Sequence, residues 1–79
     1  MVKKITKTAQ QILTALGQWP NATRLLNAWL DEEGAHFEIE QGTITPTREQ
    51  ILGFLEAPDG TLVQMEFDGD AQTVEFGVN

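Results

Sequence analysis

The chain has 79 residues, of which 41% are hydrophobic and 22% charged, a composition typical of an ordinary folded domain and not of a disordered segment. It contains no cysteine, which excludes disulfides, thiolate zinc sites, iron–sulfur clusters and cysteine nucleophiles. Twelve acidic against five basic residues give a net charge of −7, which disfavours binding to a phosphate backbone as the main role.

The first predicted element is a helix that begins after Thr6 or Thr8. Its apolar positions follow helical spacing: Ala9, Ile12, Leu13 and Leu16. Thr8 and Gln11 fit a capping box at its start, and Gly17 is a natural stop.

A second helix is expected after a tight connection at Trp19-Pro20-Asn21, in which Asn21 can serve as the cap. Its apolar stripe, with Trp29 in the core, consists of Leu25, Leu26, Trp29 and Leu30, and Gly34 ends it. Three acids would then occupy its last turn: Asp31, Glu32 and Glu33. Each would face the negative end of the helix dipole at a cost of about 0.3–1 kcal/mol, an inconsistency typical of functional positions.

After Gly34 the period changes to two, which predicts a half-buried strand. Phe37 and Ile39 fall on its inner side, and the outer side carries His36, Glu38 and Glu40. Gln41-Gly42 then turns the chain into a short return strand at Thr43-Ile44.

A third helix is expected from Thr45-Pro46 or Thr47, where Thr47 and Gln50 fit another capping box. Its apolar face would be Ile51, Leu52, Phe54 and Leu55. The turn signal Ala57-Pro58-Asp59-Gly60 ends it.

The last segment is predicted to be a hairpin, because two runs alternate with period two. The inner positions are Val63, Met65 and Phe67 in one run, and Val74, Phe76 and Val78 in the other. With Gly69-Asp70 as a two-residue turn, Met65 would face Val74, and Glu66 would face Thr73.

Together these elements predict an α+β domain spanning residues 1–79, with the order α-α-β-α-β-β and three helices on one face of a small antiparallel sheet that ends in the hairpin. If the first strand joins the hairpin, one outer face carries four glutamates and no lysine or arginine: Glu38, Glu40, Glu66 and Glu75. Their spacing would be about 6–7 Å along a strand and about 4.8 Å between strands, a lattice comparable in charge density to a nucleic-acid backbone.

The charge is also segregated along the chain. Residues 1–30 carry +4 and residues 31–79 carry −11, with Arg48 as the one basic residue of the second part. Surfaces selected only for solubility tend to mix charges of both signs, although a net charge of this size is also normal for a small soluble protein.

No catalytic, metal-binding or cofactor-binding pattern is expected. His36 is the only histidine and the chain has no serine, so neither a zinc site nor a serine triad can form. Asp68-Gly69-Asp70 lacks the later glycine and glutamate of a calcium loop, which makes it a hairpin turn. Asn21-Ala22-Thr23 matches a glycosylation sequon, but Asn21 is interpreted as a helix cap.

These observations favour a non-enzymatic inhibitor whose acidic face occupies the cationic, nucleic-acid-binding groove of a partner protein. The central residues would be Glu38, Glu40, Glu66 and Glu75, extended by Asp31, Glu32 and Glu33. In size, acidity and lack of catalytic residues the chain resembles small phage-encoded anti-defence proteins, including anti-CRISPR proteins, although it shares no motif with them.

Two alternatives stay open. The first is an accessory or homo-oligomeric module that uses an apolar patch, such as Trp19, Leu62 and Phe54, with the acids serving solubility. The second and weaker one is a nucleic-acid binder, since the element order vaguely resembles a winged helix; its third helix and hairpin lack the cations this would need. Without a membrane span or a signal peptide, a cytoplasmic location is expected.

Overall fold

The computed structural model describes residues 2–16 and 24–79, and it folds them into six strands and two helices. The strands form two antiparallel sheets of three, so the prediction of three helices on one sheet is wrong. The protein is mainly β. Gly17, the connection at Trp19-Pro20-Asn21 and the proposed Asn21 cap lie outside the described residues.

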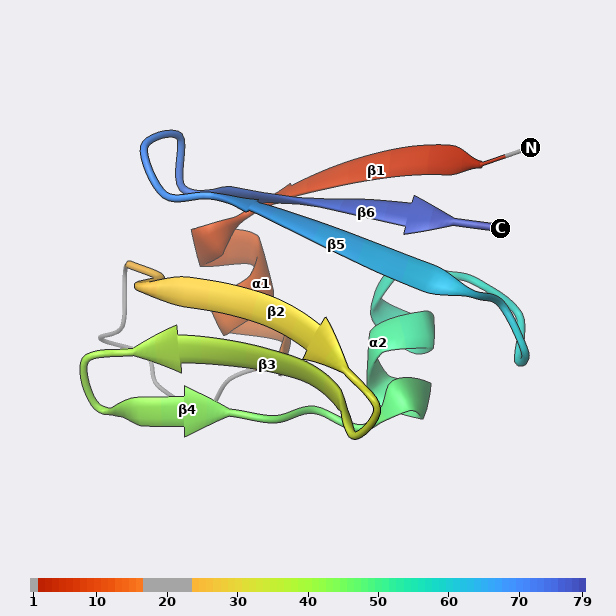
Figure 1. Cartoon of the computed structure of the whole chain (residues 1–79), viewed down its shortest axis with the longest axis horizontal. Helices are drawn as coiled ribbons and strands as arrows, with labels where there is room; N and C mark the ends of the chain where they lie inside the picture. The colour runs from red at the N-terminus through yellow and green to blue at the C-terminus, as the bar shows by residue number, and fades with distance from the viewer. Residues whose placement is uncertain (1, 17–23) are drawn as a thin grey trace.

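One sheet, which we call the terminal sheet, has the order β1 (Lys3–Thr8), β6 (Thr73–Val78), β5 (Val63–Asp68). The other, the central sheet, has the order β2 (Asn27–Asp31), β3 (Gly34–Ile39), β4 (Gly42–Ile44). β5 lies against β2 and runs in the opposite direction, but the two strands do not join into one ladder (Figure 1).

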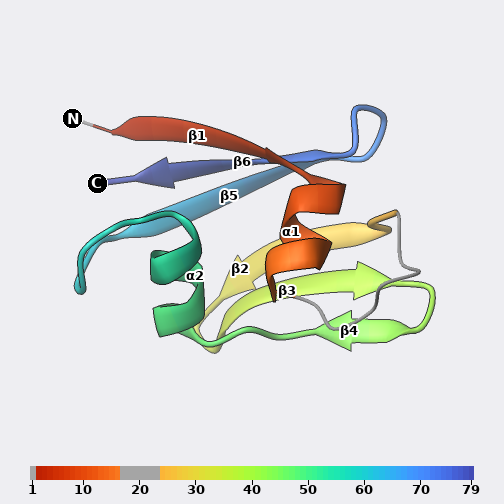
Figure 2. The same cartoon turned by 180° about the vertical axis from the view of Figure 1, so that it is seen from behind.

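Two helices, α1 (Ala9–Leu16) and α2 (Arg48–Phe54), lie on one side of both sheets, as Figure 2 shows from behind. Both helices and both sheets contribute to one hydrophobic cluster. Its largest members, Phe37 of β3 and Phe76 of β6, are completely buried. Among the described residues, neither helix is long and apolar enough to cross a membrane.

The starts of both helices confirm the two predicted capping boxes. The Thr8 N–H donates to Gln11 Oε1 at 2.8 Å, and the Gln11 N–H donates to Thr8 Oγ1 at 3.1 Å. Thr47 and Gln50 repeat the same reciprocal pair at 2.8 and 3.1 Å. Two of the N–H groups that a helix leaves unpaired at each start are thereby satisfied locally, which is why sequence alone places these starts well.

The predicted second helix is instead strand β2, and Trp29 is 37% exposed on its outer side instead of lying in the core. The Leu26 N–H donates to Glu38 O at 2.7 Å, although Glu38 already pairs with Asn27. Two residues opposite one is the arrangement of a β-bulge. Of the predicted apolar stripe only Leu25 is buried, whereas Leu26, Trp29 and Leu30 are exposed, so the helical spacing came from apolar side chains that do not enter the core.

The final hairpin forms, but its register differs by two residues from the prediction. Met65 faces Phe76, and Glu66 faces Glu75, because the loop contains four residues instead of the two of Gly69-Asp70. A shift of two keeps every side chain on its predicted face. The predicted inner and outer faces of the hairpin are therefore confirmed, and the predicted cross-strand partners are wrong.

β1 has no counterpart among the predicted elements. It pairs with β6 along its whole length, from Lys3 opposite Val78 to Thr8 opposite Thr73. Only Ile5 and Lys7 among its residues are half-buried, and Lys7 places its Nζ 5.2 Å from the centre of the Phe54 ring. With one apolar side chain in six residues, the strand owes its place to the exposed backbone edge of β6 and not to its own hydrophobic pattern.

Candidate functional site

The four glutamates expected on one sheet are divided between two sheets, because β3 does not join the hairpin. Glu38 lies half-buried in β3, and Glu40 follows that strand in the turn toward β4. Glu66 lies in β5 and Glu75 in β6 of the terminal sheet. The expected single lattice is therefore corrected to a pair on each sheet.

The outer face of the terminal sheet concentrates carboxylates at its hairpin end. Glu66 and Glu75 stand directly opposite one another, with Thr6 of β1 in the same row. Directly opposed like charges on neighbouring strands repel each other. Asp68 and Asp70 add two more carboxylates beside them, and the group surrounds a shallow open hollow of about 560 Å³. We call this the acidic hollow; its polar lining is Thr6, Glu66, Asp68, Asp70, Thr73 and Glu75.

One lysine lies next to the acidic hollow in the described part of the chain. Lys4 Nζ is 3.4 Å from Glu75 Oε1, with 70% of the lysine side chain exposed. Lys4 offsets one of the four carboxylate charges around the hollow, and an exposed ion pair of this kind contributes only about 0–1 kcal/mol to stability. Glu66, Asp68 and Asp70 make no ion pair in the described residues, which leaves a negative potential for a cationic group to relieve.

The rim of the hollow is ordered by its own hairpin loop. Asp68 Oδ1 accepts hydrogen bonds from the N–H groups of Asp70 and Ala71, each at 3.0 Å. The Asp68-Gly69-Asp70 motif is thus a hairpin turn, as predicted. In the described residues no group of three or more His, Asp or Glu side chains is arranged to hold a metal ion.

Gln72 joins this loop to the start of the central sheet, and nothing in the sequence singled it out. Its side chain accepts from the Leu25 N–H at 2.8 Å and donates to Leu25 O at 3.1 Å and Gly69 O at 2.8 Å. Its own carbonyl accepts from the Ala9 N–H at 2.8 Å. Gln72 adopts φ 56°, a conformation that is uncommon for a residue with a side chain, to make these contacts.

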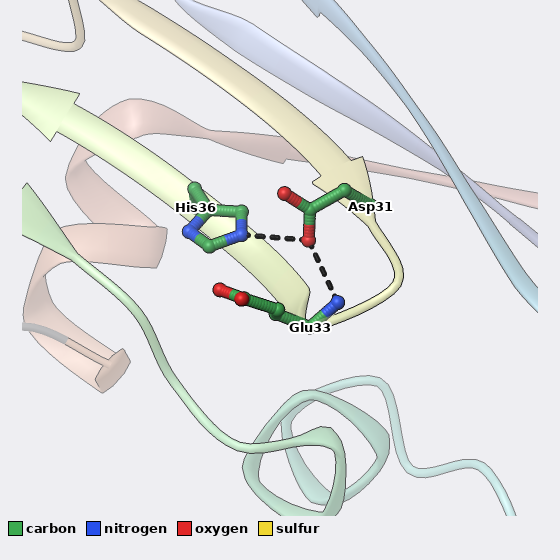
Figure 3. Close-up of polar contacts among 3 residues, drawn as sticks. All are labelled: Asp31, Glu33 and His36. Atoms are coloured by element: carbon green, nitrogen blue, oxygen red, sulfur yellow. Dashed lines mark hydrogen bonds and ion pairs between the residues drawn. The ribbon is translucent and has the colours of Figure 1, made fainter.

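The second acidic group, Asp31, Glu32 and Glu33, lies at the turn between β2 and β3 instead of at a helix end. Figure 3 shows its internal contacts: Asp31 Oδ1 accepts from the Glu33 N–H at 2.9 Å and bonds to His36 Nε2 at 2.8 Å. The His36 bond, more than the turn N–H groups, lowers the pKa of Asp31 from its ordinary value of 3.8.

His36 lies on the outer side of its strand, as predicted, but it is not freely exposed. Its ring stacks on Trp29 with the ring centres 5.1 Å apart, and 12% of its side chain is exposed. Trp29 thus covers a face of the ring, and Asp31 binds its Nε2 edge. The Asp31 carboxylate has two hydrogen-bond partners within the molecule, whereas Glu75 has only the exposed Lys4 and Glu66 has no ion pair in the described residues.

No protein family, no curated protein and no solved structure matches this chain. The function is therefore argued from the geometry of the described residues.

Proposed function

We propose that this protein is a non-enzymatic binding module that presents the acidic hollow to a cationic surface of another protein, in the manner of a nucleic-acid mimic. The observation that carries the proposal is the set of four carboxylates, Glu66, Asp68, Asp70 and Glu75, gathered around one open hollow beside a single exposed lysine. A surface of this charge attracts a groove that normally holds phosphates.

The geometry supports such binding because three of the acids stand on paired strands and Asp70 lies in a loop whose N–H groups bond to Asp68. Neighbouring strands lie about 4.8 Å apart, so the opposed Glu66 and Glu75 carry charge at a spacing similar to that of phosphates along a nucleic acid. Their mutual repulsion is already present in the free protein. A bound arginine or lysine removes it, so part of the binding free energy comes from relief of this repulsion.

The remaining predicted residues are assigned a peripheral role in this proposal. Glu38 and Glu40 belong to the central sheet, and the turn acids extend from its hairpin. Glu32 and Glu33 have exposed side chains that can add long-range attraction. Asp31 is given no direct contact, because its carboxylate already binds His36.

The test is affinity capture at low salt from the native host, comparing the wild type with the double variant Glu66→Lys/Glu75→Lys. We expect the captured partner to be released by high salt, displaced by added duplex DNA or RNA, and absent from the variant. A matched control is Glu49→Lys/Asp59→Lys, which makes the same charge change at exposed positions away from the hollow. Equal capture by both variants, or a partner that nucleic acid does not displace, contradicts the proposal.

An apolar interaction module is the second candidate, supported by the exposure of Leu62 (64%), Leu30 (39%) and Trp29 (37%). Of the patch expected from sequence, Trp19 lies outside the described residues, and Phe54 packs edge-on against Phe76 with ring centres 6.2 Å apart. This candidate predicts self-association that is insensitive to salt in sedimentation and is removed by Leu62→Ser. A monomer at every salt concentration contradicts it.

A further inference from the structure

β1 leaves one side of its backbone unpaired. It bonds to β6 on one side only and forms an outer edge of the terminal sheet, as Figure 1 shows. The opposite edge of the same sheet, β5, lies against β2, and the outer strand of the central sheet, β4, has three residues. Among the described strands, β1 is therefore the long edge strand whose free side is open to a further strand.

The backbone groups that face outward can be identified. The Ala9 N–H donates to Gln72 O, which continues the register in which Lys7, Ile5 and Lys3 pair with β6. Because antiparallel strands alternate bonded and non-bonded residues, the backbone groups of Lys4 and Thr6 point away from β6. The Thr8 N–H also points away, but it is used by Gln11, which marks the end of the open edge.

Three lysines flank this edge, on both faces of the sheet. Lys4 lies on the outer face with Thr6, whereas Lys3 and Lys7 share the inner side with the half-buried Ile5. Lysines at an edge discourage pairing with a second copy of the same strand. Pairing two copies of β1 would bring all their lysines into one interface; centred on Lys4 or on Ile5, it would place Lys4 opposite its counterpart or Lys3 opposite Lys7. The same lysines favour an occupant of opposite charge.

We propose that β1 accepts an extended acidic segment of another protein as a fourth, antiparallel strand of the terminal sheet. The register of β1 defines the segment: an acidic residue opposite Lys7, any residue opposite Thr6, an apolar residue opposite Ile5, and acidic residues opposite Lys4 and Lys3. Main-chain hydrogen bonds to Lys4 and Thr6 supply affinity, and the charged pairs select the sequence. This edge adjoins the acidic hollow, with which it shares Thr6 and the Lys4–Glu75 ion pair, but it binds through outward backbone groups and lysines instead of carboxylates, so it goes beyond the proposed function.

The probe is a fluorescein-labelled peptide, Thr-Glu-Thr-Val-Glu-Glu-Thr, whose binding is followed by fluorescence anisotropy at low salt. N-methylation of the third residue, a threonine, removes an N–H that faces Thr6. N-methylation of the fourth residue, the valine, removes an N–H that points away from β1. We expect the first change to weaken binding about tenfold and the second to leave it nearly unchanged. A scrambled peptide with all three glutamates adjacent, which has the same charge in another order, controls for charge alone. The variant Lys3→Glu/Lys4→Glu/Lys7→Glu should abolish binding.

Amide exchange measured by NMR supplies an independent readout that charge attraction alone does not affect. On peptide binding, the N–H groups of Lys4 and Thr6 should become protected, whereas that of Thr8, already bonded to Gln11, should change little. Absence of peptide binding at low salt overturns the proposal. Equal weakening by the two N-methyl groups, or binding without protection of Lys4 and Thr6, also overturns it. The triple lysine variant is checked by circular dichroism, and the N-methyl comparison on the wild type stands even if that variant unfolds.

Discussion

Asp31 in the central sheet and the pair Glu66 and Glu75 in the terminal sheet use their carboxylates in opposite ways. In the central sheet, Asp31 accepts a backbone N–H and binds His36, so its charge stabilises a turn. In the terminal sheet, Glu66 and Glu75 are directly opposite each other on neighbouring strands, with one exposed lysine nearby. The repulsion between their charges therefore lowers the stability of the fold. A protein keeps such a repulsive pair only when something outside the fold compensates for it or when its cost is small, and the two cases can be distinguished experimentally.

The largest expected effects test whether the two sheets form one cooperative unit. Phe37 and Phe76 are both completely buried in the shared core, and we expect Phe→Ala at either position to cost about 3–5 kcal/mol. Denaturant unfolding followed by fluorescence and by circular dichroism should give a single coincident transition in each variant. If Phe37→Ala unfolds the central sheet while the amides of β5 and β6 remain protected, the two sheets are separate units.

The next largest effect is expected at Gln72, which links the two sheets. Gln72→Ala removes hydrogen bonds to both backbone groups of Leu25, which lies in a buried position, and should cost about 2–3 kcal/mol in urea unfolding. Gln72→Gly removes the same bonds but relieves the positive φ, so it should be more stable than the alanine variant by up to about 1 kcal/mol. Equal stability of wild type and alanine variant would show that the link contributes nothing.

The sequence predicts the parts of the fold whose interactions are local. Both capping boxes and the alternation around Phe37 concern residues within a few positions of one another, and all are confirmed. β1, the division into two sheets and the Gln72 link depend on residues far apart in the chain, which local patterns do not encode. The acids at 31–33 were a clue: they violate helix electrostatics because no helix is there.

The candidate site was predicted only in part, for the same reason. The outward orientation of Glu66 and Glu75 follows from alternation within each strand, and it is confirmed by their pairing. Asp68 follows from the same alternation in β5, Asp70 joins the hollow from the four-residue loop, and Glu38 leaves it because β3 joins another sheet. Strand order depends on residues far apart in the chain, and the Gly69-Asp70 signal does not fix the loop length, so the composition of the site could not be predicted from the pattern.

A smaller effect tests whether the repulsion between the opposed Glu66 and Glu75 is retained because these residues bind a partner. Glu66→Lys replaces a like-charge pair by an opposite-charge pair and should stabilise the protein by about 0.5–1 kcal/mol, with Glu66→Gln giving about half of this. The gain should shrink in high salt. If Glu66→Lys is more stable and also loses the partner, the repulsion is retained for binding. Unchanged stability at low salt would show that the pair does not repel.

The smallest effect concerns the pH dependence of the central sheet. The bond to His36 lowers the pKa of Asp31, so its stabilising contribution is complete above the ordinary value of 3.8 and is lost as pH falls through the lowered value. His36→Phe keeps an aromatic ring beside Trp29 but removes this bond, so the pKa of Asp31, measured by NMR, should rise toward 3.8. No rise would assign the shift to the turn N–H groups instead.

The boundary between β2 and β5 has a consequence for how this architecture can change. The two strands lie side by side without a shared ladder, and the Asn27 side chain bonds the Ala28 N–H at 2.9 Å within β2 itself. A junction built from side chains can be remodelled by substitution without disturbing any strand pairing. Substitutions at this junction can therefore change the angle between the two sheets. Variants would then present the same surfaces to partners of different shape.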